Sequence, residues 1–153
     1  MENQASRPNA ALEFLGVFLG EWNIEISSFQ EDPSAVFHGH ASFQWLEGGT
    51  FLLERSQVPE TDFPSLTAVI GPDDAAGSYC MLYSDSRGVS RIYQMSLSES
   101  TWKLWREFPG FSQRFIATFN DDRRILTGYW ENSTDGSNWE RDFNIKYAKV
   151  NKS

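Results

Sequence analysis

The sequence predicts an all-β fold: an antiparallel up-and-down barrel of roughly ten strands, closed at one end by a short N-terminal helix. Only residues 9–19 show helical spacing of apolar positions. After Trp22 the chain alternates between short extended segments, rich in aromatic and β-branched residues, and clusters of turn-forming residues. The connections are short enough for a meander, and a long meander removes its exposed edges most readily by closing on itself.

Length and composition predict a single domain over residues 1–153. A chain of 153 residues buries about two-thirds of its unfolded surface as one domain, whereas two smaller domains would each be marginally stable. Aromatic residues make up 15% of the chain, with Phe 12 and Trp 6. Such bulk favours a β-rich interior or an apolar cavity.

The N-terminal segment predicts a helix over residues 9–19. Asn9 is a suitable N-cap and Gly20 a suitable stop. The apolar face of this helix combines Leu12, Leu15, Phe18 and Leu19, so we expect it to cover one barrel end. Gly20 then permits a sharp turn, and Trp22 is expected to close that end.

The turn residues divide the rest of the chain into strand candidates. These candidates are 21–29, 36–47, 50–58, 65–71, 78–85, 90–98, 101–108, 112–120, 124–133 and 137–149. We find no internal repeat, low-complexity tract or linker.

Alternation along each strand predicts which side chains face the interior, because successive side chains point to opposite sides. The expected inner sets are Trp22, Ile24 and Ile26; Phe37, Gly39, Ala41, Phe43 and Trp45; Tyr79, Met81, Tyr83 and Asp85; Arg91, Tyr93, Met95 and Leu97; Gln113, Phe115, Ala117 and Phe119; Leu126, Gly128 and Trp130; and Trp139, Arg141, Phe143, Ile145 and Tyr147. The third, fifth and seventh strands stay undecided, because apolar pairs such as Leu52 and Leu53 or Trp102 and Trp105 occupy both faces. A β-bulge would invert any of these assignments.

Four segments resemble the calycin superfamily, and within it lipocalin-like barrel proteins of a family with no assigned function. They are Gly20-Glu21-Trp22, residues 45–51, residues 83–88 and residues 127–131. The resemblance covers nearly the whole chain. It implies a barrel of the lipocalin and fatty-acid-binding type with an internal pocket, and no particular activity.

Related barrels carry fatty acids, retinoid-like molecules or haem, and the haem-binding nitrobindins use a histidine late in the chain. Here both histidines, His38 and His40, are early, so the resemblance disfavours haem, and no cofactor is expected. On the second strand, His38 and His40 are expected to lie on the solvent side. With a carboxylate they could bind a metal, but surface histidines are the simpler interpretation.

The predicted inner wall is aromatic with a few polar anchors, a composition typical of a site for a mostly apolar small molecule. The ligand-contact candidates are Trp22, Phe43, Trp45, Tyr83, Arg91, Tyr93, Met95, Gln113, Phe115, Trp130, Arg141 and Phe143. We therefore expect a non-catalytic carrier or sensor whose ligand is apolar, with or without an anionic group.

Two arginines need partners because a guanidinium stays protonated. Arg91 could meet a ligand carboxylate or pair with Asp85. Arg141 could face the cavity or stack over Trp22, as a basic residue of the last strand does in many lipocalins.

A cofactor-independent isomerase, cyclase or hydrolase is the alternative. No motif of a nucleophilic, metal-dependent or nucleotide-binding site occurs, so catalytic residues are unknown. Inward tyrosines or carboxylates would then serve, with Glu54, Asp85, Glu140 and Asp142 as candidates. A solvated or ion-paired surface role is the simpler expectation for each. A third alternative is self-association, for example as a homodimer, through an exposed aromatic patch.

The formal net charge of -8 disfavours nucleic acid as a partner. No stretch of apolar residues is long enough to span a bilayer, and the first residues lack an export signal. We therefore expect a cytoplasmic location without membrane contact.

Cys80 is the one cysteine, which excludes an intramolecular disulfide, and we expect it to be buried.

Overall fold

The chain folds into ten strands preceded by a short helix. The structure is a computed structural model that describes residues 10–28, 34–59, 61–74 and 77–151. The strands within these residues are β1 (Gly20–Ser28), β2 (Phe37–Trp45), β3 (Leu52–Gln57), β4 (Leu66–Asp73), β5 (Ser78–Asp85), β6 (Ser90–Leu97), β7 (Thr101–Arg106), β8 (Ser112–Phe119), β9 (Ile125–Ser133) and β10 (Glu140–Lys149). All ten overlap the predicted segments.

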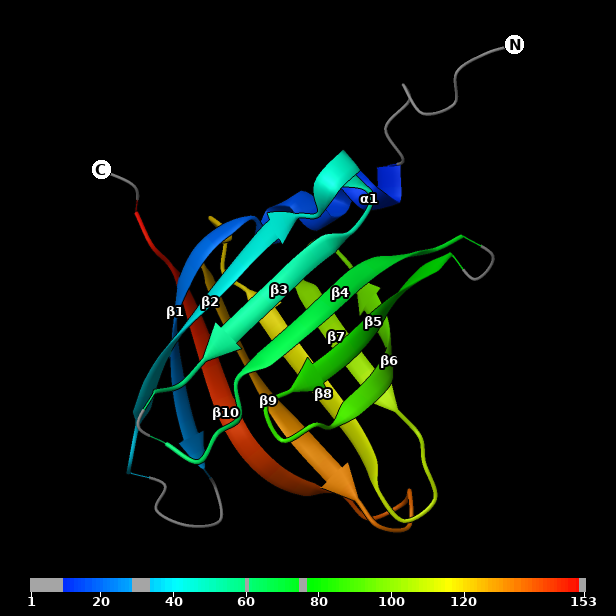
Figure 1. Cartoon of the computed structure of the whole chain (residues 1–153). Coiled ribbons are helices and arrows are strands. Elements are labelled where there is room, and N and C mark those ends of the chain that lie inside the picture. The colour runs from blue at the N-terminus through cyan, green and yellow to red at the C-terminus, as the bar shows by residue number, and fades with distance from the viewer. Residues whose placement is uncertain (1–9, 29–33, 60, 75–76, 152–153) are drawn as a thin grey trace.

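The strands form one closed antiparallel barrel in which each strand pairs with its neighbours in the sequence. The first and last strands complete the circle: β1 pairs with β10 from Trp22 opposite Lys149 to Ser28 opposite Phe143. The amide of Val150 extends this seam by donating to the carbonyl oxygen of Glu21 at 2.8 Å. The predicted up-and-down barrel is therefore confirmed (Figure 1).

The helix covers one end of the barrel, as expected, although it is less regular than predicted. An α-helical turn, α1 (Ala10–Phe14), tightens into a 3₁₀ segment, η2 (Leu15–Phe18). The predicted cap, Asn9, lies outside the described residues. Phe18 is fully buried, and its ring packs against Phe43 and Trp102 with ring centroids 5.1 and 4.8 Å apart. The helix lies across this end of the barrel (Figure 1), and the three rings belong to the core there.

Gly20 and Trp22 join the helix to the first strand. Gly20 has φ +120°, a backbone conformation that favours glycine, which explains the turn there. Two residues later the indole Nε1 of Trp22 donates a hydrogen bond to the carbonyl oxygen of Phe18 at 2.7 Å. This bond satisfies an indole N–H in the core and fixes the helix on the barrel.

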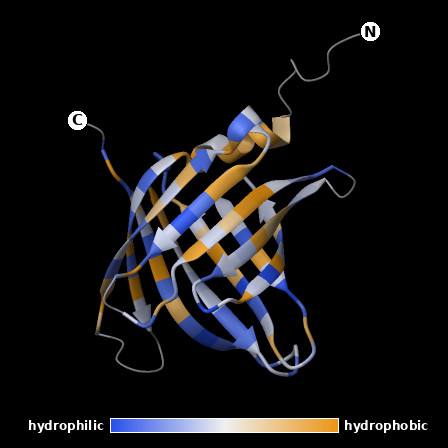
Figure 2. Cartoon of the chain, viewed as in Figure 1, coloured by the Kyte–Doolittle hydropathy of each residue, from blue (hydrophilic) through white to orange (hydrophobic). Residues whose placement is uncertain are grey.

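The predicted alternation is confirmed on most strands, and Figure 2 shows hydrophobic and hydrophilic residues alternating along them. The buried core includes Trp22, Ile24 and Ile26 of β1, Tyr79 and Met81 of β5, Tyr93 and Met95 of β6, and Phe115, Ala117 and Phe119 of β8. For the strands whose inward side chains the sequence left undecided, the buried residues and the residues that line the cavity give the answer. Leu52, Glu54 and Ser56 face inward on β3, and Trp102 and Leu104 face inward on β7.

A β-bulge in β10 overturns the predicted orientation of Arg141. The register with β9 shifts between Arg141 and Phe143, so Phe143 lies opposite Trp130 inside while Arg141 lies opposite Glu131. The guanidinium of Arg141 stacks on Tyr129, 3.5 Å from the ring centroid, on the outer face. The cation near Trp22 is instead Lys149, 5.2 Å from the ring.

The predicted exposure is wrong for Cys80 and confirmed for the two histidines. Cys80 is exposed rather than buried, because Tyr79 and Met81 point inward and alternation turns Cys80 to the outer face. His38 and His40 lie on the outer side of β2, as predicted, and His40 bonds to Glu21.

Replacing Gly128 by alanine should strongly destabilise the barrel. A Cβ at this position in β9 would lie 2.3 Å from the carbonyl oxygen of Ile116 and 2.6 Å from the Cβ of Ala117 on β8. We expect the free energy of unfolding to fall by about 3 kcal/mol, measured by urea denaturation. Gly16→Ala is the control, because the nearest atom to its new Cβ is 3.9 Å away. Equal stability of the two variants would contradict this packing.

Candidate functional site

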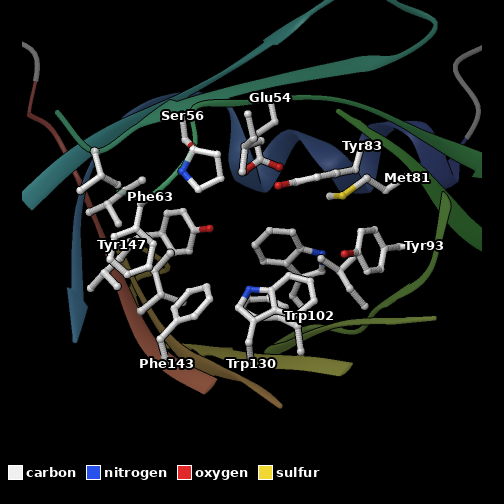
Figure 3. Close-up of a pocket in the computed structure, with 18 residues that line it drawn as sticks. Glu54, Ser56, Phe63, Met81, Tyr83, Tyr93, Trp102, Trp130, Phe143 and Tyr147 are labelled. Carbon is white, nitrogen blue, oxygen red and sulfur yellow. The ribbon is translucent and has the colours of Figure 1, made fainter. Parts of the chain in front are cut away.

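The described residues of the barrel enclose an apolar cavity that lies away from the helix. Its volume is about 90 Å³, and the space is surrounded by aromatic and aliphatic side chains (Figure 3). The lining residues are Ile24, Ile26, Glu54, Ser56, Val58, Phe63, Pro64, Leu66, Met81, Tyr83, Tyr93, Trp102, Leu104, Phe115, Trp130, Phe143, Ile145 and Tyr147. No lysine, arginine or histidine is among them.

The size of the cavity limits what it can hold. Pockets for drug-sized ligands measure about 300–1,000 Å³, and an apolar cavity of about 150 Å³ holds benzene. The interior here is mostly filled by rings in mutual contact, such as Trp102 with Phe115 and Tyr93 with Trp130. A long acyl chain or a retinoid-sized molecule does not fit in this form of the barrel. At about 90 Å³ the cavity is smaller than the space that holds benzene, so a single small ring is the largest group that it admits, and the lining side chains must then move slightly apart.

Glu54 is a carboxylic acid inside this aromatic space. It lies at the centre of β3, between Phe43 of β2 and Ala68 of β4, and only 2% of it is exposed. Burial disfavours the charged form and raises the pKa of Glu54 to about 8. The side chain is therefore mostly an uncharged acid at neutral pH. The simpler expectation of a surface role is wrong for this residue.

Trp102 carries an unused hydrogen-bond donor in the same wall. Its indole is 1% exposed, and its Nε1 has no hydrogen-bond partner. Figure 3 shows the Glu54 carboxyl on one side of the cavity and the indoles of Trp102 and Trp130 on the opposite side. An unsatisfied buried donor costs about 1–3 kcal/mol. Such a group is uncommon in a folded protein, and a ligand acceptor would relieve its cost.

Two tyrosines bring further hydroxyl groups to the wall. Tyr147 is buried close to Glu54, and burial and the Glu54 charge together raise the pKa of its phenol well above the ordinary value. Tyr93 donates to Oε1 of Gln113 at 2.8 Å. The cavity therefore combines apolar rings with a small number of hydrogen-bonding groups.

Tyr83 links the cavity to a charged pair at the barrel end. Its hydroxyl donates to Asp85 at 2.6 Å, and Asp85 accepts a second 2.6 Å bond from Arg87. These bonds hold the pKa of Asp85 well below its usual range. Asp85 is thus a structural partner of Arg87 and not of Arg91.

The other two candidate carboxylates lie on β10. Glu140 is exposed, whereas Asp142 is partly buried, and this burial raises its pKa.

The structure brings together only part of the predicted contact set. Tyr83, Tyr93, Phe115, Trp130 and Phe143 line the cavity. The predicted residues that do not line it are Trp22, Phe43, Trp45 and Met95, which belong to the core or pack against it; Gln113, which bonds Tyr93; Arg91; and Arg141 on the outer face. Contact with a ligand stays a prediction for all of them.

Sequence reasoning named Glu54 among four candidate carboxylates but favoured a surface role for it, and it left the orientation of Trp102 undecided. A signal for Glu54 exists in the alternation of Leu52, Glu54 and Ser56, but the equally apolar Leu53 obscured it. Trp102 shares its strand with Trp105, and only the pairing with β8 shows which of the two faces inward.

Comparison with solved structures shows similarity to several proteins. Rv2717c from Mycobacterium tuberculosis superimposes with a TM-score of 0.64 at 12% identity, covering 95% of this chain and 100% of that one. A protein of unknown function from the DUF3598 family of Nostoc punctiforme gives 0.58 at 13% identity, covering 97% of this chain and 52% of that one. At these identities the likeness shows the fold alone. No family model and no curated protein matches the sequence.

Within the described ranges, no three His, Cys, Asp or Glu side chains gather closely enough to hold a metal ion. None of the helices in this part of the chain has the length and apolar character needed to cross a membrane.

Glu54 should make stability depend on pH. Its pKa is about 8 in the folded barrel against an ordinary 4.5, so the folded state keeps a proton that the unfolded state releases. The resulting stabilisation is complete below pH 4.5 and is lost as pH rises towards 8, by about 1.4 kcal/mol for each pH unit. Glu54→Gln, which cannot ionise, should therefore gain stability relative to the wild type over this range, measured by urea denaturation.

Glu140→Gln on the exposed side of β10 is the matched control and should track the wild type. A constant difference between Glu54→Gln and the wild type from pH 4.5 to 8 would contradict an acid that is buried and uncharged.

Proposed function

We propose that this protein binds a small, mostly apolar molecule in the barrel cavity and acts as a carrier or sensor. The observation that carries the proposal is the buried Nε1 of Trp102, a hydrogen-bond donor without a partner in the wall of an aromatic cavity. A ligand carbonyl or ether oxygen would accept this bond while its ring packs against Trp130 and Phe115. Binding would then remove an energetic defect of the empty barrel.

The part of the ligand inside the cavity is uncharged. No cationic side chain lines the space, so a buried anion would have no counterion there. Glu54 is itself mostly neutral at pH 7, and as a protonated acid it both donates and accepts a hydrogen bond. The resemblance to calycins supports the same kind of function, since that superfamily includes many carriers of small apolar molecules.

The proposal is tested with single-ring carbonyl compounds, for which we choose acetophenone and 3-phenylpropanamide. Isothermal titration calorimetry should show saturable binding of at least one of them. Trp102→Phe keeps an aromatic ring but removes the N–H, and it should weaken binding by about 1 kcal/mol, roughly fivefold in Kd.

Trp105→Phe is the control, because Trp105 lies on the outer face of the same strand, and this variant should bind as the wild type does. Absence of binding to the wild type, or equal affinities for the wild type and Trp102→Phe, would contradict the proposal.

Glu54 also favours a second candidate function, proton transfer without a cofactor. Its pKa of about 8 places a carboxyl group in the range where it works as a general acid or base near neutral pH. In this function the Glu54 carboxylate would take a proton from a carbon next to a carbonyl, and a nearby donor would stabilise the enolate oxygen.

Deuterium incorporation into the methyl group of acetophenone in D₂O, followed by NMR, tests the second candidate. The exchange rate should rise with pH to a plateau above about pH 8, and Glu54→Gln should lower it by about 100-fold or more. Glu140→Gln should leave it unchanged. Exchange no faster than in buffer, or insensitive to Glu54→Gln, would exclude this chemistry.

A further inference from the structure

The barrel end opposite α1 carries a polar arc on its inner side. The β5–β6, β7–β8 and β9–β10 turns, at residues 85–90, 106–112 and 133–140, lie at this far end. Neighbouring strands contribute to the arc: Arg91 of β6 lies opposite Tyr83 of β5, and Arg106 of β7 lies opposite Gln113 of β8. Arg91 shares the inward face of β6 with Tyr93, and Arg106 that of β7 with Leu104.

The two arginines gather around Tyr93, which also lines the cavity. Burial raises the pKa of Tyr93, while a hydrogen bond from Arg91 and the positive charges of Arg91, Arg106 and Arg87 lower it. Continuing the β6–β7 register from Gln94 opposite Trp105 places Arg106 across from Tyr93, and Arg91 lies two residues before Tyr93 on the same face of β6.

Arg91 and Arg106 are held in place by rings and not by carboxylates. Arg91 lies over Phe111 at 5.4 Å and Arg106 over Phe108 at 5.0 Å from the ring centroids. Among the described residues neither is ion-paired, whereas Arg87 is neutralised by Asp85. Two half-buried cations without counterions provide a favourable place for an anion.

The opposite half of the cavity wall at this end is apolar. Val58, Phe63, Pro64 and Leu66, from the end of β3, the β3–β4 connection and the start of β4, line the cavity there. Figure 3 shows Tyr83 and Tyr93 together on one side of the space and Phe63 and Phe143 on the other. The far end therefore presents a cationic side and an apolar side to anything that enters the cavity.

The geometry points to an amphiphilic ligand whose ring enters the cavity and whose carboxylate stays at the far end, bound by Arg91 and Arg106. This inference rests on the proposed function and adds the ligand's charged end to it. The arginine forks match a carboxylate in shape and charge, and their aromatic supports limit their motion before binding. An aryl-alkyl carboxylate is the simplest member of this class.

The test compares two probes of equal shape, 3-phenylpropionate and its neutral amide, 3-phenylpropanamide, by isothermal titration calorimetry. The wild type should bind the carboxylate about tenfold or more tightly than the amide. Raising NaCl from 20 to 500 mM should weaken binding of the carboxylate only. Arg91→Gln and Arg106→Gln should each lower affinity for the carboxylate by about tenfold and leave affinity for the amide unchanged.

Arg55→Gln is the matched control. Arg55 is exposed, and it follows the inward-facing Glu54, so it lies on the outer face of β3. It removes the same charge from the molecule and should not change either affinity. Arg91→Lys keeps the charge without the fork and should retain part of the preference for the carboxylate. Circular dichroism confirms that each variant is folded before its affinity is compared.

The outcomes separate this inference from the proposed function. Equal affinity for the two probes, or carboxylate binding unaffected by both arginine variants, overturns the arginine site even when the amide binds in the cavity. Absence of carboxylate binding to the folded wild type overturns it whatever the amide does. Failure of both the amide and acetophenone to bind counts against the proposed function.

Discussion

Closure of the barrel through the pairing of β1 with β10 is the constraint on which the rest of the structure depends. If this seam were open, both strands would expose unpaired backbone groups, and water would reach the rings of the interior. The seam begins beside Trp22, whose hydrogen bond to Phe18 attaches the helix to the same edge. One short stretch of sequence thus closes the sheet laterally and seals one of its ends.

This sealing makes the two ends of the barrel chemically different. At the α1 end, the rings of Phe18, Phe43 and Trp102 pack against one another, with centroids 4.8 to 6.5 Å apart. Toward the far end the packing is less complete, and the small cavity forms there, with Glu54 and the Trp102 donor in its wall. A buried donor without a partner reduces stability, and the Trp102 N–H in an otherwise well-packed interior is the observation behind the binding role that we propose.

The sequence was sufficient to predict the fold and the inward-facing side chains of most strands. On a closed barrel one face of each strand is exposed to solvent and the other is buried, so apolar and polar residues alternate. It failed where this rule is broken locally. The bulge before Phe143 turned Arg141 outward, and bulges have no reliable sequence signal. The paired leucines of β3 and the two tryptophans of β7 hid the cavity's polar groups, because only the pairing with neighbouring strands assigns their faces. Arg91 was recognised from the sequence, but its partner Arg106 became evident only from the register.

The central claim is that the indole N–H of Trp102 is a donor kept for a ligand. The most direct measurement is the ¹H–¹⁵N spectrum of the indole groups, with the Trp102 signal assigned by its loss in Trp102→Phe. Titration with 3-phenylpropanamide should move the Trp102 proton signal downfield, as expected for a new hydrogen bond, and leave that of Trp22, already bonded to Phe18, nearly unchanged. A Trp102 signal that does not respond at saturating ligand would contradict the account.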